Sequence, residues 1–273
     1  MRKIHNYLAA TLVLISLPSF AQTPITLNFT DPNLTDGKTI KLEAFLYEPT
    51  NPNGKTILFS HGSTGGKKES IKETIKFMRI GKLVSDNGYR MVAYMRKGRG
   101  GSEGVFKEES GKCDRDSLNS EVADAYPQMD QVVDQIRKNY KTDKIILMGH
   151  SRGGFLSTVY AAKNPDKILS AVNFAGVWSA FCENRNGGFS HDMLGDSAKK
   201  FKNLYWAYFE NDSYFASDTF NDPNYDWMSS TASKNGITFK KYPMADMKDG
   251  HLTPTWRPEI WANDVIRWLN DRK

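Results

Sequence analysis

The sequence has 273 residues, of which 37 are Lys or Arg and 31 are Asp or Glu, and its formal net charge is +6. Because the basic residues form no long run, this mild positive charge gives little support to nucleic-acid binding. The two cysteines lie far apart and form no CxxC pair, so their spacing does not predict a zinc site.

The N-terminus has the features of a secretory signal peptide. Arg2 and Lys3 give it a basic start, the apolar run Tyr7–Leu17 follows, and small residues stand before a cleavage site after Ala21. The apolar run is about half of the ~20 residues that a membrane-spanning helix needs. We therefore expect cleavage and export to the periplasm or the medium, with no stable membrane insertion.

Residues 1–21 are thus the predicted signal peptide, and residues 22–273 are expected to form one domain. Short apolar or alternating runs predict strands over Ile25–Phe29, Thr39–Tyr47, Lys55–Ser60, Tyr89–Met95, Lys144–Met148, Ile168–Phe174, Leu204–Phe209 and Ile237–Tyr242. Helical spacing predicts helices over Ser70–Val84, Ser117–Tyr140, Phe155–Lys163 and Pro258–Asn270. Pro127 is expected to kink or split the second of these helices.

Strands that alternate with helices imply an α/β fold, with a mostly parallel sheet of about eight strands flanked by helices. The segment between Gly176 and Asn203 is short, so we expect a small lid or none.

The pentapeptide from Gly149 to Gly153 reads G-H-S-R-G and matches the pattern G-x-S-x-G. It follows a predicted buried strand and opens a predicted helix, which is the context that a nucleophile elbow requires. The sharp turn needs small neighbours, and Gly149, Gly153 and Gly154 supply them. We therefore expect Ser151 to be a nucleophile whose hydroxyl stands above the sheet.

These residues resemble the α/β-hydrolase superfamily, over nearly the whole mature chain. His61, Gly62 and Ser63 look like its oxyanion segment after the third strand. The loop Met95–Gly104 is similar to the R-G-x-G-x-S-x-G loop common among dienelactone-hydrolase-like enzymes and the catalytic domains of prolyl-oligopeptidase-like peptidases. The chain has no room for the β-propeller of those peptidases, and strict dienelactone hydrolases use a cysteine nucleophile instead of serine.

The superfamily order of Ser, then acid, then His places the base after the last strand. His251 stands there, before the last predicted helix, and is the expected base. The other histidines fit less well: His5 leaves with the signal peptide, His61 and His150 belong to the motifs above, and His191 has no motif around it.

The acid is expected just after the strand Leu204–Phe209. The turn that ends in Asp212 mirrors the G-x-x-D turn of the superfamily, with Phe209 in place of Gly, and this favours Asp212. Glu210 is the runner-up, and Asp218 and Asp222 are further candidates.

The resemblance implies two-step acyl transfer on a small-molecule acyl substrate, without a metal or organic cofactor. Ser151, Asp212 and His251 would form the triad, and the backbone amides of Ser63 and Arg152 the oxyanion hole. An esterase is the first hypothesis. A peptidase or amidase with the same triad, and a silent binding protein on the same fold, are the alternatives. The oligomeric state stays open.

Loop residues near the triad have two interpretations each. Arg96, with Lys97 and Arg99, either pairs with a substrate carboxylate or pins its own loop. Arg152 either meets substrate or is a solvated residue at a helix start. Aromatic residues could line an acyl pocket or belong to the core, namely Trp178, Phe181, Phe189, Tyr214 and Phe215.

Export makes a disulfide plausible for the two cysteines. In this fold the loops that carry Cys113 and Cys182 both overhang the carboxyl edge of the sheet, above Ser151. We therefore expect a bond that ties the segment after Gly176 to the rim of the pocket. Two separate buried thiols are the alternative.

Overall fold

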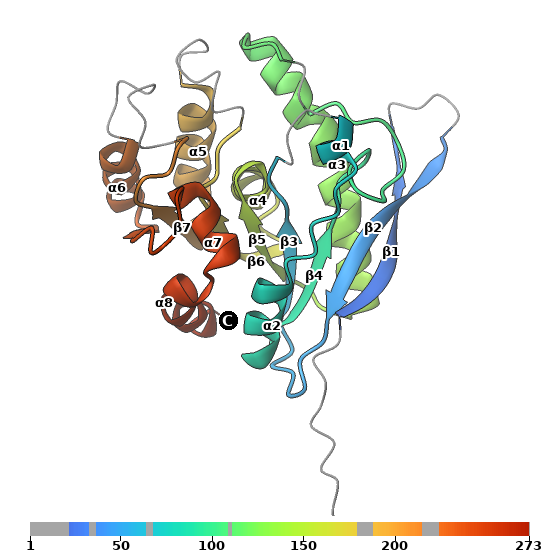
Figure 1. Ribbon diagram of the computed structural model, residues 1–273, viewed down its shortest axis with the longest axis horizontal. Helices are drawn as coiled ribbons and strands as arrows, with labels where there is room; N and C mark the ends of the chain where they lie inside the picture. Colours follow the sequence, from blue (N-terminus) through green and yellow to red (C-terminus); the bar gives the residue numbers. More distant parts are fainter. Residues whose placement is uncertain are drawn as a thin grey trace, which may run out of the picture.

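An eight-stranded sheet runs through the middle of the molecule (Figure 1). The computed structural model describes residues 22–32, 37–63, 68–108, 111–178, 188–214 and 224–272. Its strands are β1 (Gln22–Thr30), β2 (Thr39–Tyr47), β3 (Thr56–Ser60), β4 (Arg90–Tyr94), β5 (Ile145–His150), β6 (Ile168–Phe174), β7 (Leu204–Phe209) and β8 (Thr238–Tyr242).

The order of the strands across the sheet is β1-β2-β4-β3-β5-β6-β7-β8. β2 pairs antiparallel with both β1 and β4, and every other pairing is parallel. The predicted strands are therefore confirmed, as is a mostly parallel sheet of about eight strands. In a parallel sheet all carboxyl ends meet at one edge, so the loops after β3, β5, β7 and β8 lie near one another.

Helices cover both faces of the sheet. They are α1 (Lys68–Ile71), α2 (Met78–Asp86), α3 (Arg115–Asn139), α4 (Arg152–Lys163), α5 (Phe189–Lys200), α6 (Asn224–Asn235), α7 (Thr253–Trp256) and α8 (Glu259–Asn270), with the 3₁₀ turn η2 (Gly250–Leu252). α2 and α8 share one apolar core with the sheet, and α3 to α6 share the other. In Figure 1, α2 and α8 lie side by side.

Burial on both faces explains why the central strands do not alternate between apolar and polar residues. Every residue of β3, β5 and β7 is buried. The apolar run at Ile145, Ile146 and Leu147 is typical of such a two-sided strand. The sheet is thus a rigid platform, and its carboxyl edge carries the candidate site.

Two helix predictions were wrong in part. The predicted helix Ser70–Val84 is two helices, α1 and α2, separated by irregular chain. Phe77, at the start of α2, has a left-handed backbone with φ of 55°, which no continuous helix allows. Pro127 does not split α3, which runs on for 25 residues. The proline removes one intrahelical bond, and apolar packing of α3 on the sheet outweighs that loss.

The sequence pattern did not predict α5 and α6. Their inward faces mix large apolar residues, such as Leu194 and Met228, with small ones, such as Ala198 and Ala232, so the apolar periodicity is weak. α5 packs against α4 in the helical layer, so this part of the segment after Gly176 is not a lid. No helix in the described ranges is long and apolar enough to cross a membrane.

Candidate active site

Ser151 lies in the sharp turn between β5 and α4. Its backbone has φ of 55° and ψ of −125°, a conformation that an L-residue rarely adopts. The turn can form because glycines surround it: a Cβ on Gly149 would overlap the backbone of Gly153, and one on Gly153 would overlap the carbonyl of Ser60. The amide of Ser151 donates to the carbonyl of Phe174 at 2.9 Å. The strained backbone is therefore held from two neighbouring strands.

His251 and Asp212 meet at the same edge of the sheet. Nδ1 of His251 lies 3.0 and 3.1 Å from the two carboxylate oxygens of Asp212. Asp212 is fully buried and also accepts a hydrogen bond from the amide of Tyr214 at 2.9 Å. Glu210 is exposed. The structure thus brings Asp212 to the histidine and leaves Glu210 outside the pair, while Asp218 and Asp222 lie outside the described residues.

The loop of His251 is attached to the elbow through His150. Nε2 of His150 donates to the carbonyl of His251 at 2.6 Å, and the centroids of the two rings are 4.8 Å apart. Burial, and then the neighbouring His251, lower the pKa of His150 to about 3. His150 is therefore neutral at physiological pH, as a single donor to that carbonyl requires. Because Ser151 directly follows His150 in the chain, this contact attaches the loop of the candidate base to the residue before the candidate nucleophile.

The segment after β3 passes directly beside Ser151. A Cβ on Gly62 would lie 2.8 Å from Cβ of Ser151, so only a glycine allows this approach. Ser63 follows at the surface. Arg152 is the first residue of α4, and amides in the first turn of a helix have no partner within the helix. Backbone amides from both segments therefore border the space around the serine.

Arg96 holds the segment after β3 in place. Its Nη1 donates to the carbonyl of His61 at 2.6 Å, and its amide donates to Nε2 of the same histidine at 3.0 Å. Nε and Nη2 bind the carboxylate of Glu108. Although burial favours the neutral acid, Arg96 lowers the pKa of Glu108 to about 2. The guanidinium of Arg96 is completely buried, so of the two interpretations the structure supports the pinned loop.

The other cations of this loop are also engaged inside the protein. Nζ of Lys97 lies 2.8 Å from Asp31 and 2.7 Å from Asp124. The guanidinium of Arg99 stacks over the ring of Phe106 at 3.8 Å. These contacts stabilise the loop after β4 and leave no exposed cation there for a substrate carboxylate among Arg96, Lys97 and Arg99.

The aromatic candidates separate into core and site. Trp178 is fully buried and donates to Glu121 at 2.9 Å, and Phe189 is also in the core. Tyr214 is 42% exposed, and its ring centroid lies 4.4 Å from that of His251. Of the two interpretations, the structure supports the core for Trp178 and Phe189, while Tyr214 contacts the candidate base. Phe181, Phe215 and Cys182 lie outside the described residues.

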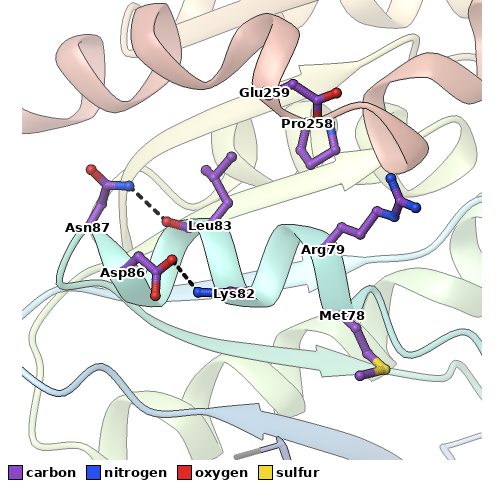
Figure 2. Close-up of a pocket in the computed structure, with 8 residues that line it drawn as sticks. All are labelled: Met78, Arg79, Lys82, Leu83, Asp86, Asn87, Pro258 and Glu259. Atoms are coloured by element: carbon purple, nitrogen blue, oxygen red, sulfur yellow. Dashed lines mark hydrogen bonds and ion pairs between the residues drawn. The ribbon is translucent and has the colours of Figure 1, made fainter. Parts of the chain in front are cut away.

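A separate groove lies between α2 and the start of α8, with a volume of about 500 Å³ (Figure 2). An exposed Met78 stands at one end, and the ion pair of Lys82 with Asp86 lies along the helix. No member of the Ser151, Asp212 and His251 group lines this groove. It is therefore distinct from the candidate active site. The described residues include no cluster of three or more side chains suited to a metal.

Sequence reasoning missed the contacts that three residues make around the site: His150, Glu108 and Asp249. The side chain of Asp249 accepts the amide of His251 and begins the turn η2 as its N-cap. An Asp two residues before the candidate base is a capping signal that could have been recognised. Glu108 gave no such signal, because nothing in its neighbourhood in the sequence points to Arg96.

Residues 55–235 match the family described as alpha/beta hydrolase fold. The match covers more than half of the chain, and the sheet order and the elbow agree with it. The chain therefore belongs to the α/β-hydrolase-fold family, as the sequence motifs indicated. The narrower resemblance to dienelactone-hydrolase-like or prolyl-oligopeptidase-like enzymes stays a prediction.

Individual relatives are distant. An abhydrolase domain-containing protein of Caenorhabditis elegans is 30% identical over 101 residues, which are 36% of this chain and 20% of that protein. The chain thus matches about a fifth of the length of this curated relative. An esterase of Pyrococcus furiosus has a TM-score of 0.61 at 14% identity, over 93% of this chain and 92% of its own. Est1E of Butyrivibrio proteoclasticus, with bound ferulic acid, has a TM-score of 0.61 at 15% identity, over 90% and 98%.

Proposed function

We propose that this chain is a serine hydrolase that cleaves carboxylic esters of small-molecule acyl substrates through an acyl-enzyme. The observation that carries the proposal is the buried pair of Asp212 and His251, whose loop is hydrogen-bonded to His150, the residue before Ser151 on its strained turn. A nucleophile, a base and an acid that orients the base are the components of a catalytic triad.

Nδ1 of His251 is engaged by Asp212, which leaves Nε2 to exchange a proton with Ser151. In the first step Nε2 takes the hydroxyl proton while Oγ attacks the ester carbonyl. The proton then passes to the departing alcohol as the C–O bond breaks. In the second step water attacks the acyl-enzyme by the same route. Asp212 fixes the tautomer and stabilises the imidazolium that forms in each step.

The oxyanion of each tetrahedral intermediate would be bound by the backbone amides of Ser63 and Arg152. Both residues adjoin Ser151, one through the close approach of Gly62 and the other through the chain itself. Rigid donors at such a position contribute more than flexible ones, because they need no reorganisation during the reaction. Arg96 contributes indirectly, since it holds the carbonyl of His61 and thereby the course of the segment.

An ester is favoured over an amide substrate by the named esterases among the similar structures, although identities of 14% and 15% transfer only the fold. Tyr214 is the described aromatic residue placed to contact the substrate. Export is also part of the proposal, with residues 1–21 as a cleaved signal peptide.

The test is labelling with a fluorophosphonate probe, followed by rates on p-nitrophenyl esters and on peptide p-nitroanilides. We expect label on Ser151, and turnover of the esters that exceeds turnover of the anilides. Ser151→Ala should lower ester turnover by about 10⁴ to 10⁶-fold, as in other triads. Ser230→Ala, an exposed serine on α6, is the control that should leave both signals intact. Full turnover by Ser151→Ala would disprove the proposal, and faster anilide cleavage would make the protein an amidase.

A further inference from the structure

We propose that Asp249 is a positioning residue for His251: its carboxylate ties the loop of the base to the loop of the acid. The catalytic part of this inference rests on the proposed function. The geometric part is independent of it, because the contacts of Asp249 exist whether or not a substrate is cleaved.

The carboxylate of Asp249 joins two loops that follow different strands. Oδ1 accepts the amide of His251 at 2.9 Å and the amide of Ser213 at 3.0 Å. Oδ2 accepts the hydroxyl of Ser213 at 2.7 Å. Ser213 directly follows Asp212, so one side chain connects the residue beside the acid to the backbone of the base.

The two loops also meet through their backbones. The amide of Gly250 donates to the carbonyl of Asn211 at 3.1 Å, and a Cβ at Gly250 would overlap the carbonyl of Glu210. The two loops are therefore in contact at Gly250. A glycine has no side chain, so this contact alone does not orient the neighbouring His251. The carboxylate of Asp249 adds a polar link, because one of its bonds holds the amide of His251 and the other two hold Ser213.

The carbonyl of His251 accepts a hydrogen bond from Nε2 of His150. Amide and carbonyl of the base are thus both anchored, one to the acid loop and one to the elbow. Anchoring at both ends limits the movement of the imidazole between Asp212 and Ser151. A displacement of about 1 Å in such a group can cost about 10²-fold in rate.

Asp249 is also a negative charge close to His251. Partial burial favours the neutral acid, but hydrogen bonds from His251 and from Ser213 lower the pKa of the Asp249 carboxyl below its usual value. The titratable groups that face the pair are Asp212 and Tyr214 from the acid loop, His150 from the elbow and Tyr225 from α6, with Glu210 further out. Asp212 and Asp249 are the two carboxylates of this set that are hydrogen-bonded to His251.

Two substitutions at this position separate bonds from charge. Asp249→Asn keeps an oxygen for the two amides and can donate to the hydroxyl of Ser213, so it removes the charge and retains the geometry. Asp249→Ala removes both. Ser213→Ala removes one hydrogen bond and keeps the charge. Asp246→Asn removes an exposed carboxylate of the same loop, paired with Arg257, and is the matched charge control.

The measurements are kcat and KM for an ester and the NMR chemical shift of the backbone amide of His251. For Asp249→Ala we expect kcat to fall by about 10²-fold with KM unchanged within twofold. The amide signal of His251 should move in the same variant, because the amide loses its acceptor. Asp249→Asn should recover most of the lost kcat and keep the amide signal near its wild-type position, since an oxygen remains for the amide. Ser213→Ala should lower kcat less than Asp249→Ala does, and Asp246→Asn should leave both readings at the wild-type level.

The inference is overturned if Asp249→Ala acts on KM alone or keeps its kcat, or if Asp249→Asn loses as much kcat as Asp249→Ala. If Asp249→Ala does not fold, Ser213→Ala decides the question, and a kcat at the wild-type level in that variant would overturn the inference. If the wild-type protein shows no turnover that depends on Ser151, the proposed function is wrong. The amide signal of His251 in Asp249→Ala and Asp249→Asn would then still decide whether Asp249 holds the loop of His251.

Discussion

At the scale of single residues, the parts of the site that follow a local pattern could be predicted from the sequence. The glycines around Ser151 indicated a nucleophile elbow, and the place of His251 between the last strand and the last helix indicated the base. Asp212 was favoured over Glu210 by its position in a turn, and the structure places it at the histidine. The surroundings of Arg96 and Trp178 could not be predicted, because residue type does not reveal whether a polar group finds its partner inside the protein.

Substitution distinguishes the two candidates for the acid of the proposed triad, Asp212 and Glu210. Asp212→Asn should lower kcat by about 10⁴-fold, because an amide at this position favours the wrong tautomer of the base. Glu210→Gln should change kcat by less than threefold, since Glu210 is exposed. Ester turnover at saturating substrate is the measurement. The reverse ranking would assign the role of the acid to Glu210 and leave Ser151 and His251 in place.

The buried histidines make stability sensitive to acid. Burial lowers the pKa of His150 to about 3 and that of His61 well below its usual value. Below pH ~6.5 the unfolded chain therefore binds protons that the folded protein does not bind. Stability is complete above that pH and is lost as the pH falls, by about 1.4 kcal/mol per pH unit for each such histidine.

Urea unfolding at pH 7, 6 and 5 checks this. His150→Gln should reduce the slope of the free energy of unfolding against pH by about 1.4 kcal/mol per pH unit. The slope that is left in this variant is due in part to His61. The lowered pKa of Glu108 acts only below its ordinary value, outside this range. An unchanged slope in His150→Gln would show that His150 is not held neutral.

At the scale of elements, the strands were easier to predict than the helices. A strand buried on both faces is a short run of apolar residues, which is easy to recognise in the sequence, as in β5. A helix that packs on a sheet needs only a few apolar residues, and in α5 and α6 small side chains take part of that role. The break before α2 depends on the backbone at Phe77, and nothing in the residue type indicated a left-handed conformation there.

The loop after β4 depends on the ion pair of Arg96 with Glu108. Glu108→Gln should destabilise the protein by about 3 to 5 kcal/mol, because it leaves a buried guanidinium without its counter-charge. Arg96→Met combined with Glu108→Leu should restore much of that stability. It should still lower ester turnover, since the carbonyls of His61 and Gly62 lose their donor.

Thermal or urea unfolding measures the first effect and kcat the second. Asp86→Asn, which breaks the exposed ion pair with Lys82, is the control and should cost less than about 1 kcal/mol. A Glu108→Gln protein as stable as the wild type would mean that the guanidinium of Arg96 is solvated or paired in another way.

At the scale of the whole molecule, one sheet with helices on both faces was predicted from the alternation of strands and helices, and it is confirmed. The predictions for the chain ends and for the cysteines concern residues that the structure does not describe, namely residues 1–21 and Cys182. They follow from the sequence alone and need a direct measurement.

Exported protein should begin at Gln22 and contain a bond between Cys113 and Cys182. The closed loop spans 182 − 113 = 69 steps along the chain, for which chain entropy gives roughly 4 kcal/mol of stabilisation, often less. N-terminal sequencing and mass spectrometry of non-reduced peptides check both points. Two cysteines that react freely with an alkylating agent in the native, exported protein would contradict the bond.

The left-handed backbone at Ser151 means that the side chain proposed as the nucleophile lowers the stability of the fold at its own position. Glycine adopts φ of 55° with ψ of −125° without the steric penalty that a Cβ brings. Ser151→Gly should therefore remove turnover and at the same time raise the free energy of unfolding by about 1 kcal/mol. Selection for thermal stability alone would erode the active site at this position, so any search for heat-resistant variants of this protein has to screen for activity as well.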